Sequence, residues 1–172
     1  EMRKLKAIIL RNENDKDHLQ WVEACERNSS LIDYEVVDLT SVWWFELVTA
    51  RPVDILLAKP GGLTSHFKQL YDERIYILSQ ANYRIFPSPL EIYLYENKRL
   101  LSYWLKSNQI PHPATNVFYS QYEAIEYIRC ASFPIVAKTN IGASGSGVRL
   151  LYSGTEALAY IEQTFYGKGS PQ

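Results

Sequence analysis

The residues best suited to chemistry lie between two apolar runs near the end of the chain. The first run, residues 133–137, leads into Lys138, and soon afterwards the chain reads Gly142-Ala143-Ser144-Gly145-Ser146-Gly147. Val148 begins the second apolar run. Glycines allow backbone N–H groups to turn toward anionic oxygens, and a lysine adds a point charge. A strand, a lysine, a glycine-rich loop and a second strand are therefore suited to holding a polyphosphate.

Three well-known phosphate loops do not match this pattern. A P-loop continues with lysine and then serine or threonine after its second glycine, where this chain has Val148 and Arg149. A dinucleotide fingerprint reads GxGxxG and opens a helix, whereas this loop reads GxxGxG and precedes a strand-like run. In a protein kinase the lysine follows the loop, and here it comes before it. A plain glycine-rich hairpin with a solvated Lys138 stays open as the alternative.

Composition narrows the class of protein. The chain has 172 residues, of which 47% are hydrophobic and 13% aromatic, so it can bury a core. Its net charge is −1 and it has no run of lysine or arginine, which argues against nucleic-acid or membrane partners. Cys25 and Cys130 stand alone and are interpreted as buried thiols, and the N-terminus does not resemble a signal peptide. Both features favour a cytoplasmic location.

The first half of the chain alternates between strand and helix patterns. The first helix is expected after a cap at Asn14 or Asp15, the second begins at Thr40 or Ser41, and the third covers residues 63–80. Short apolar runs predict strands at residues 5–10, 34–39, 53–58 and 83–86. This order predicts a wound α/β domain with a mainly parallel sheet and helices on both faces.

Wound sheets bind ligands beyond the carboxyl ends of their strands. The local candidates are therefore residues 11–14, Thr40 and residues 59–62. Ordinary turns are favoured for the first two, whereas the adjacent glycines of residues 59–62 leave a ligand contact open. Trp43 and Trp44 stand beside Leu47 at helical spacing and are assigned to the core rather than to a stacking platform.

The second half begins with a helix that links two lobes. Asn97 is expected to cap this helix, which starts at Lys98 and ends near Asn108, ahead of two prolines. Beyond it, two Ser-x-x-Glu capping boxes, at Ser120 and Ser153, each open a helix. Strands are expected at residues 116–119, 135–138 and 147–152. The prediction is a small α+β lobe of three strands and two helices, with domains at residues 1–95 and 96–172.

Three motifs stand in order along this half of the chain. They are Glu96-Asn97-Lys98 with the following Ile110-Pro111-His112-Pro113-Ala114-Thr115, then the strand Phe133-Pro134-Ile135-Val136-Ala137-Lys138, then the loop from Gly142 to Val148. Each is weak alone, but together they resemble the N-terminal portion of the ATP-grasp superfamily, in its carboxylate–amine/thiol ligase type. The resemblance implies a wound pre-ATP-grasp domain, then the small ATP-grasp subdomain, with the second ATP-grasp lobe absent.

The resemblance also implies roles for individual residues toward ATP. Lys98 would lie near the α-phosphate, Lys138 near the α- and β-phosphates, and the loop would close over the β- and γ-phosphates. The implied ATP-binding residues are Lys98, Lys138, Gly142, Ala143, Ser144, Gly145, Ser146, Gly147 and Val148. The Mg²⁺ ligands of the family lie downstream of this loop and its helix, so no metal ligand is expected in this chain.

The expected parent protein is an ATP-dependent ligase that acts on a small-molecule carboxylate through an acylphosphate. The 172-residue chain is expected to be a fragment of it, favoured over a naturally short relative because half a nucleotide cleft leaves ATP open to water, and to be inactive by itself. Two alternatives stay open, a non-catalytic nucleotide-binding or regulatory module and an ATP-grasp kinase. Assembly as a homodimer is also left open.

Overall fold

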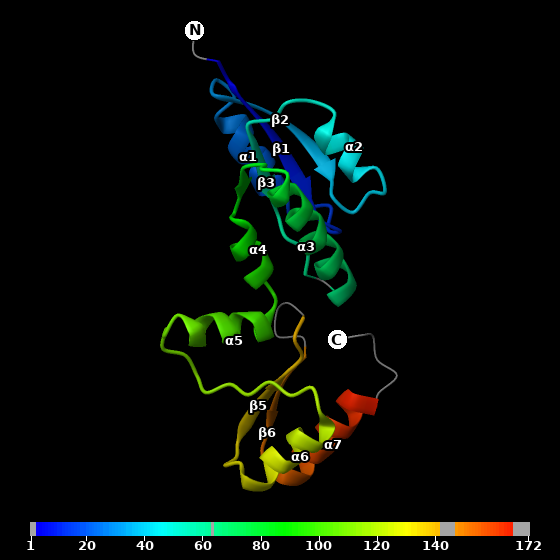
Figure 1. Ribbon diagram of the computed structural model, residues 1–172, viewed down its shortest axis with the longest axis vertical. Coiled ribbons are helices and arrows are strands. Elements are labelled where there is room, and N and C mark those ends of the chain that lie inside the picture. The colour runs from blue at the N-terminus through cyan, green and yellow to red at the C-terminus, as the bar shows by residue number, and fades with distance from the viewer. Residues whose placement is uncertain (1–2, 63, 142–146, 167–172) are drawn as a thin grey trace. The chain divides into compact units, whose positions relative to one another are not determined.

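A computed structural model describes residues 3–62, 64–141 and 147–166 of the chain (Figure 1). The chain forms two compact units, Glu1–Tyr95 and Glu96–Gln172, and each is described by itself. Within the described residues, no helix combines the length and apolar character needed to cross a bilayer.

The first unit is built on a parallel sheet of four strands in the order β2-β1-β3-β4. The strands are β1 (Leu5–Arg11), β2 (Ile32–Asp38), β3 (Ile55–Ala58) and β4 (Ile85–Phe86). The helices are α1 (Leu19–Arg27), α2 (Trp44–Thr49), α3 (Ser65–Gln80) and α4 (Pro89–Leu94). The predicted wound parallel sheet is confirmed.

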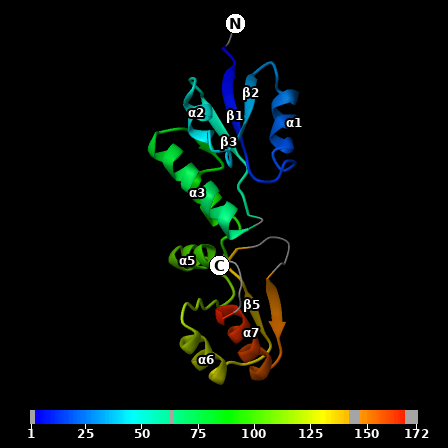
Figure 2. The same cartoon turned by 90° about the vertical axis from the view of Figure 1, so that its right-hand side faces the viewer.

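Both faces of the central strand β1 are buried. Ile8 and Leu10 belong to the larger core cluster with residues of α2, α3 and α4, whereas Ala7 and Ile9 pack with Cys25 of α1. Figure 2 shows α1 on one side of the sheet and α2 and α3 on the other. Because successive side chains of a strand point to opposite faces, one apolar run supplies both cores.

The first two helices begin later than the sequence predicts. Asn14 does not cap α1, because its side chain accepts the N–H of Lys16 at 2.8 Å, and Asn12 likewise accepts the N–H of Asn14 at 2.8 Å. Such local bonds compete with helix formation. In the same way, the Asp38 carboxylate accepts the N–H of Thr40 at 2.9 Å, so residues 40–43 form a turn.

Two assignments to the core are wrong. Trp43 precedes α2 and is 65% exposed, whereas Trp44, one residue later, packs against the larger core cluster. The delayed start of α2 moves Trp43 off the buried face. Cys130, at the end of its helix, is exposed, although Cys25 is buried as expected.

The described residues of the second unit form a two-stranded antiparallel sheet and three helices. The strands are β5 (Ile135–Lys138) and β6 (Val148–Leu151), and the helices are α5 (Lys98–Ser107), α6 (Gln121–Cys130) and α7 (Gly154–Tyr166). Helices α6 and α7 pack side by side, and α7 contacts β6 (Figure 1).

The predicted strand at residues 116–119 is not formed. These residues are irregular, and within the described part of the chain no backbone hydrogen bond pairs them with a neighbouring strand. An extended segment becomes a strand only where a partner satisfies its backbone groups. The serine half of both predicted capping boxes is confirmed, since Ser120 accepts the N–H of Glu123 and Ser153 that of Glu156.

Candidate functional site

The start of α5 is bound to the segment that follows β5. The carbonyl oxygen of Asn140 accepts the N–H of Lys98 at 3.3 Å, and its side-chain oxygen accepts the N–H of Arg99 at 2.9 Å. An isolated antiparallel bridge joins Asn97 to Ile141 beside these bonds. The helix that carries Lys98 is therefore attached two residues beyond Lys138, although 40 residues separate the two lysines.

These contacts leave the amides at the start of α5 occupied. Asn140 takes those of Lys98 and Arg99, and the Asn97 side chain accepts the N–H of Leu100 at 3.0 Å, as predicted for a cap. The Lys98 ammonium lies 3.5 Å from the Asn140 carbonyl oxygen and 3.9 Å from Glu96. A ligand at this end of α5 would therefore meet the lysine side chain and not the helix amides.

One face of the β5–β6 sheet is exposed and apolar beside Lys138. Val136 and Lys138 are two residues apart on β5 and therefore lie on the same face. The register places Leu150 opposite Val136 and Val148 opposite Lys138. Val136 is 55% exposed, Leu150 47% and Val148 39%. The opposite face turns to α7, since Leu151 is buried and the Arg149 guanidinium lies 6.0 Å from the Tyr160 ring centroid.

Gly147 has a structural requirement of its own. Its φ is +74°, and a Cβ added there would overlap Thr139 Oγ1 and lie 3.1 Å from Thr139 Cβ. The N–H of Thr139 donates to the Gly147 carbonyl oxygen at 2.9 Å, which closes the base of the loop. The role of Gly147 toward phosphate stays a prediction, and Gly142, Ala143, Ser144, Gly145 and Ser146 lie outside the described residues.

In the first unit, Gly61 and Gly62 contact other residues of the same unit. The Gly62 N–H donates to the Glu13 carboxylate at 3.3 Å, and a Cβ on Gly61 would lie 2.8 Å from Glu13 Oε2 and 3.3 Å from the Phe67 carbonyl oxygen. The close approach that a pair of glycines permits is therefore made by Glu13 and the start of α3.

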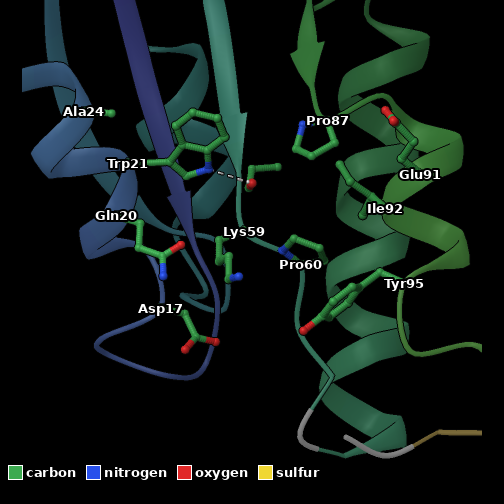
Figure 3. A pocket seen from close by; sticks show the side chains of 11 residues that line it. Asp17, Gln20, Trp21, Ala24, Lys59, Pro60, Pro87, Glu91, Ile92 and Tyr95 are labelled. Carbon is green, nitrogen blue, oxygen red and sulfur yellow. Dashed lines mark hydrogen bonds between the residues drawn. The ribbon is translucent and has the colours of Figure 1, made fainter. Parts of the chain in front are cut away.

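A cavity of about 460 Å³ lies beside this turn, within the first unit. Figure 3 shows Lys59 between α1, which carries Gln20 and Trp21, and the segment that follows β4. The lining residues are Asp17, Gln20, Trp21, Ala24, Ala58, Lys59, Pro60, Pro87, Glu91, Ile92 and Tyr95. Sequence reasoning pointed to residues 59–62 but missed the wall formed by α1 and α4, because no local pattern pairs these helices.

The carboxyl ends of β1 and β2 carry an ion pair between Arg11 and Asp38. Burial acts to raise the pKa of Asp38, but the hydrogen bonds from Thr40 and Arg11 outweigh it and hold that pKa below its usual range. Burial, followed by the charge of Arg11, lowers the pKa of His18. In the described part of the chain, no three His, Cys, Asp or Glu side chains gather closely enough to hold a metal ion.

Comparison with known proteins identifies the fold. The sequence matches no protein-family model, and no curated protein matches it significantly. The structure is similar to an ATP-grasp RimK domain protein of Sphaerobacter thermophilus, with 17% identity and a TM-score of 0.67, over 93% of this chain and 60% of that one. It is also similar to N5-carboxyaminoimidazole ribonucleotide synthetase of Thermus thermophilus, with 12% identity and a TM-score of 0.64. That similarity covers 96% of this chain and 45% of the synthetase chain.

A third similar structure is the biotin carboxylase domain of the 2-oxoglutarate carboxylase of Hydrogenobacter thermophilus, in complex with MgADP, ADP and bicarbonate. Here the identity is 14% and the TM-score 0.58, over 94% of this chain and 42% of that one. The chain thus spans less than two thirds of each similar structure. It has the fold of the N-terminal part of ATP-grasp proteins, with the wound domain followed by the small subdomain.

Proposed function

We propose that this chain, which has the fold of the N-terminal part of ATP-grasp proteins, forms one side of the ATP site of an ATP-dependent carboxylate ligase. The observation that carries the proposal is the attachment of Lys98 to Asn140, at 3.3 Å between backbone N and O. It brings the linker lysine to the base of the glycine loop, two residues beyond Lys138. The fold and this juxtaposition support the same assignment.

The exposed face of β5–β6 has the character that a nucleotide needs. Val136 and Leu150 offer apolar area to a base and a ribose, and Lys138 on the same face offers a charge to phosphate oxygens. The sequence signal for this surface is the two-residue spacing of Val136 and Lys138, which places both side chains on one face of β5. Lys98 supplies a second charge, and the backbone amides of residues 143–147 are assigned to the β- and γ-phosphates.

The proposed reaction transfers the γ-phosphoryl group of ATP to a carboxylate oxygen of the substrate, and ADP leaves as the bond between its β-phosphate oxygen and the γ-phosphorus breaks. The acylphosphate that forms is then attacked by an amine or a thiol, which displaces inorganic phosphate. In this scheme Lys98 and Lys138 hold the triphosphate in position and neutralise its charge, the two contributions that dominate phosphoryl transfer. Among the described residues no three His, Cys, Asp or Glu side chains gather at one place, and no role in metal binding is assigned to them.

The test is the thermal stability of the chain with and without ATP. A ligand that binds only the folded state raises its melting temperature, so millimolar ATP is expected to stabilise the chain. Lys138→Met is expected to abolish that increase and to leave the melting temperature without ATP unchanged, because Lys138 is exposed. Lys106→Met, at the exposed end of α5, is the matched control. Equal stabilisation of Lys138→Met and the parent chain would refute the site.

The ligase reaction itself is tested in a longer protein that contains this chain. Hydroxylamine traps an acylphosphate as a hydroxamate, so a ligase incubated with ATP and its carboxylate substrate yields this product. A kinase that phosphorylates an alcohol yields none. Hydroxamate formation that is lost in Lys138→Met would link the chemistry to the proposed site.

A further inference from the structure

The cavity of the first unit has a rigid wall with a charged side chain projecting from it. The N–H of Lys59 donates to Tyr71 Oη at 3.0 Å and to the Leu10 carbonyl oxygen at 3.3 Å. On one side, the Ala58 carbonyl oxygen accepts the Trp21 indole N–H at 3.0 Å (Figure 3). On the other side, the Pro60 carbonyl oxygen accepts the Asn12 amide at 2.9 Å. The backbone of residues 58–60 is therefore held by α1, α3 and the turn after β1.

The polar groups of the cavity are of two kinds. Glu91 is occupied, because its carboxylate accepts both the N–H and the hydroxyl of Ser88 at 2.7 Å in the cap of α4. Asp17, Gln20 and Lys59 lie toward the same end (Figure 3). Among the described residues, no side chain or carbonyl pairs with the Lys59 ammonium or the Gln20 amide, and Asp17 accepts from Asn12 through Oδ2. This end presents one cation, one anion and one amide.

The rest of the lining is apolar. Trp21, Ala24, Pro87 and Ile92 surround the space away from the charged end, and Ile92 is fully buried. The Trp21 ring is fixed on two sides, by its bond to the Ala58 carbonyl oxygen and by an edge contact with Phe86 at 5.7 Å. A volume of about 460 Å³ falls within the range of small-molecule sites, which combine apolar walls with few polar groups.

We propose that this cavity binds a free α-amino acid with an apolar side chain. The ligand carboxylate accepts from Lys59 Nζ and the Gln20 amide, and its ammonium group donates to the Asp17 carboxylate. Charge decides between ligand classes, because a simple anion beside Lys59 is repelled by Asp17, and a simple amine beside Asp17 is repelled by Lys59. A zwitterion satisfies both, and its side chain packs against Trp21, Ala24 and Pro87.

All the residues that line the cavity belong to the first unit, so its proposal as a binding site uses no residue of the nucleotide site. The further idea that this amino acid is a substrate rests on the proposed function, because a ligase would join its carboxylate or its amine to a second molecule. The two ideas are separated by measuring amino-acid binding in the absence of nucleotide.

The experiment is calorimetric titration of the 172-residue chain with L-leucine. N-acetyl-L-leucine, which lacks the ammonium charge, and L-leucinamide, which lacks the carboxylate, are expected to bind at least about tenfold more weakly, because each leaves one charge of the site without its partner. In ¹H–¹⁵N spectra, L-leucine is expected to shift the indole signal of Trp21 and to leave that of exposed Trp43 in place.

Two variants locate the site. Lys59→Met keeps the backbone bonds of residue 59 and removes its charge, and it is expected to weaken L-leucine binding at least about tenfold with an unchanged circular dichroism spectrum. Lys16→Met, on an exposed lysine of the turn before α1, is the matched control and is expected to bind like the parent chain. Absence of L-leucine binding, or equal affinity of Lys59→Met, would overturn the proposal. Equal affinity for N-acetyl-L-leucine would overturn the zwitterion assignment.

Discussion

The side-chain oxygen of Asn140 accepts a hydrogen bond from the backbone N–H of Arg99 at 2.9 Å, across 41 residues of sequence. The carbonyl oxygen of the same asparagine accepts the neighbouring N–H of Lys98. One residue thereby satisfies two of the four amides that a helix leaves unpaired at its start. The lysine on the linker helix and the base of the glycine loop are joined through this single contact residue.

Asn140→Ala removes the side-chain part of this contact. The N–H of Arg99 is partly buried and loses its acceptor, so the free energy of unfolding of the second unit should fall by about 1–2 kcal/mol. ATP-dependent stabilisation should fall as well, because the start of α5 is less firmly held to the loop. Asn116→Ala is the control, since Asn116 is exposed and its side chain forms no hydrogen bond with the residues that the structure describes. Chemical denaturation of both variants measures the difference, and equal stabilities would contradict the role given to Asn140.

Gly147→Ala tests the closure of the loop. Positive φ costs a residue with a Cβ about 1–2 kcal/mol, and the overlap with Thr139 adds about 1–3 kcal/mol, so we expect a loss of about 2–5 kcal/mol. Gly154→Ala, at the start of α7, is the matched control because a Cβ there meets nothing within 4 Å. It should be neutral or stabilising by up to about 1 kcal/mol.

The double variant Gly147→Ala, Thr139→Gly separates the two terms. Removal of the Thr139 side chain relieves the overlap but leaves the positive φ, so Gly147→Ala should cost less stability in the Thr139→Gly background than in the parent chain. Thermal unfolding of the two single variants and the double variant measures the two costs. An equal cost in both backgrounds would mean that Thr139 is not the obstacle.

Lys98→Met distinguishes a binding role from a structural one. A cation at a helix N-terminus is unfavourable by about 0.3–1 kcal/mol, whereas the contacts of the Lys98 ammonium, which lies 3.5 Å from the Asn140 carbonyl oxygen and 3.9 Å from the Glu96 carboxylate, are favourable. These terms oppose each other, so stability without ATP should change by less than about 1 kcal/mol. ATP-dependent stabilisation should decrease, and Lys106→Met should show neither effect. A large loss of stability without ATP would assign Lys98 to the fold instead.

Most elements of the fold could be predicted because their causes are local. The apolar run through Ile8 and Ile9 places buried side chains on both faces of the parallel sheet. Asn97 and Ser120 cap the helices that follow them. Predictions were wrong where two local structures competed. The side chains of Asn14 and Asp38 bond backbone amides ahead of the helices, which therefore start later than the pattern indicates.

The contacts that build the candidate site depend on distant parts of the chain. Nothing beside Asn140 in the sequence indicates that it caps a helix that begins 42 residues earlier, and nothing beside Gly147 points to Thr139 as its neighbour. The exposed face of β5–β6 could be predicted in part, because Val136 and Lys138 are two residues apart on one strand and so lie on the same face. The motifs located the two lysines, but the way in which they are held required the structure.

A buried ion pair in α3 predicts the pH dependence of the first unit. Lys68 is 2% exposed, and its ammonium donates to Asp72 at 2.7 Å and to the Ile92 carbonyl oxygen at 2.6 Å, which joins α3 to α4. Burial raises the pKa of Asp72 to about 6, although the hydrogen bond and charge of Lys68 act to lower it. Folding therefore favours the protonated carboxyl group, and ionisation of Asp72 costs stability.

The sign of the effect follows from proton binding. Between the pKa of an unfolded aspartate, about 4, and the folded value, the native state binds more protons, so stability falls as pH rises. The contribution of Asp72 is fully present below pH about 4 and is lost as pH rises through about 6. At about 1.4 kcal/mol per pKa unit, the difference amounts to as much as about 3 kcal/mol. Asp72→Asn should remove this dependence, and Glu73→Gln, on the exposed side of α3, should retain it. Denaturant unfolding of the three proteins at several pH values measures it, and parallel curves for the parent chain and Asp72→Asn would show that Asp72 does not titrate in this range.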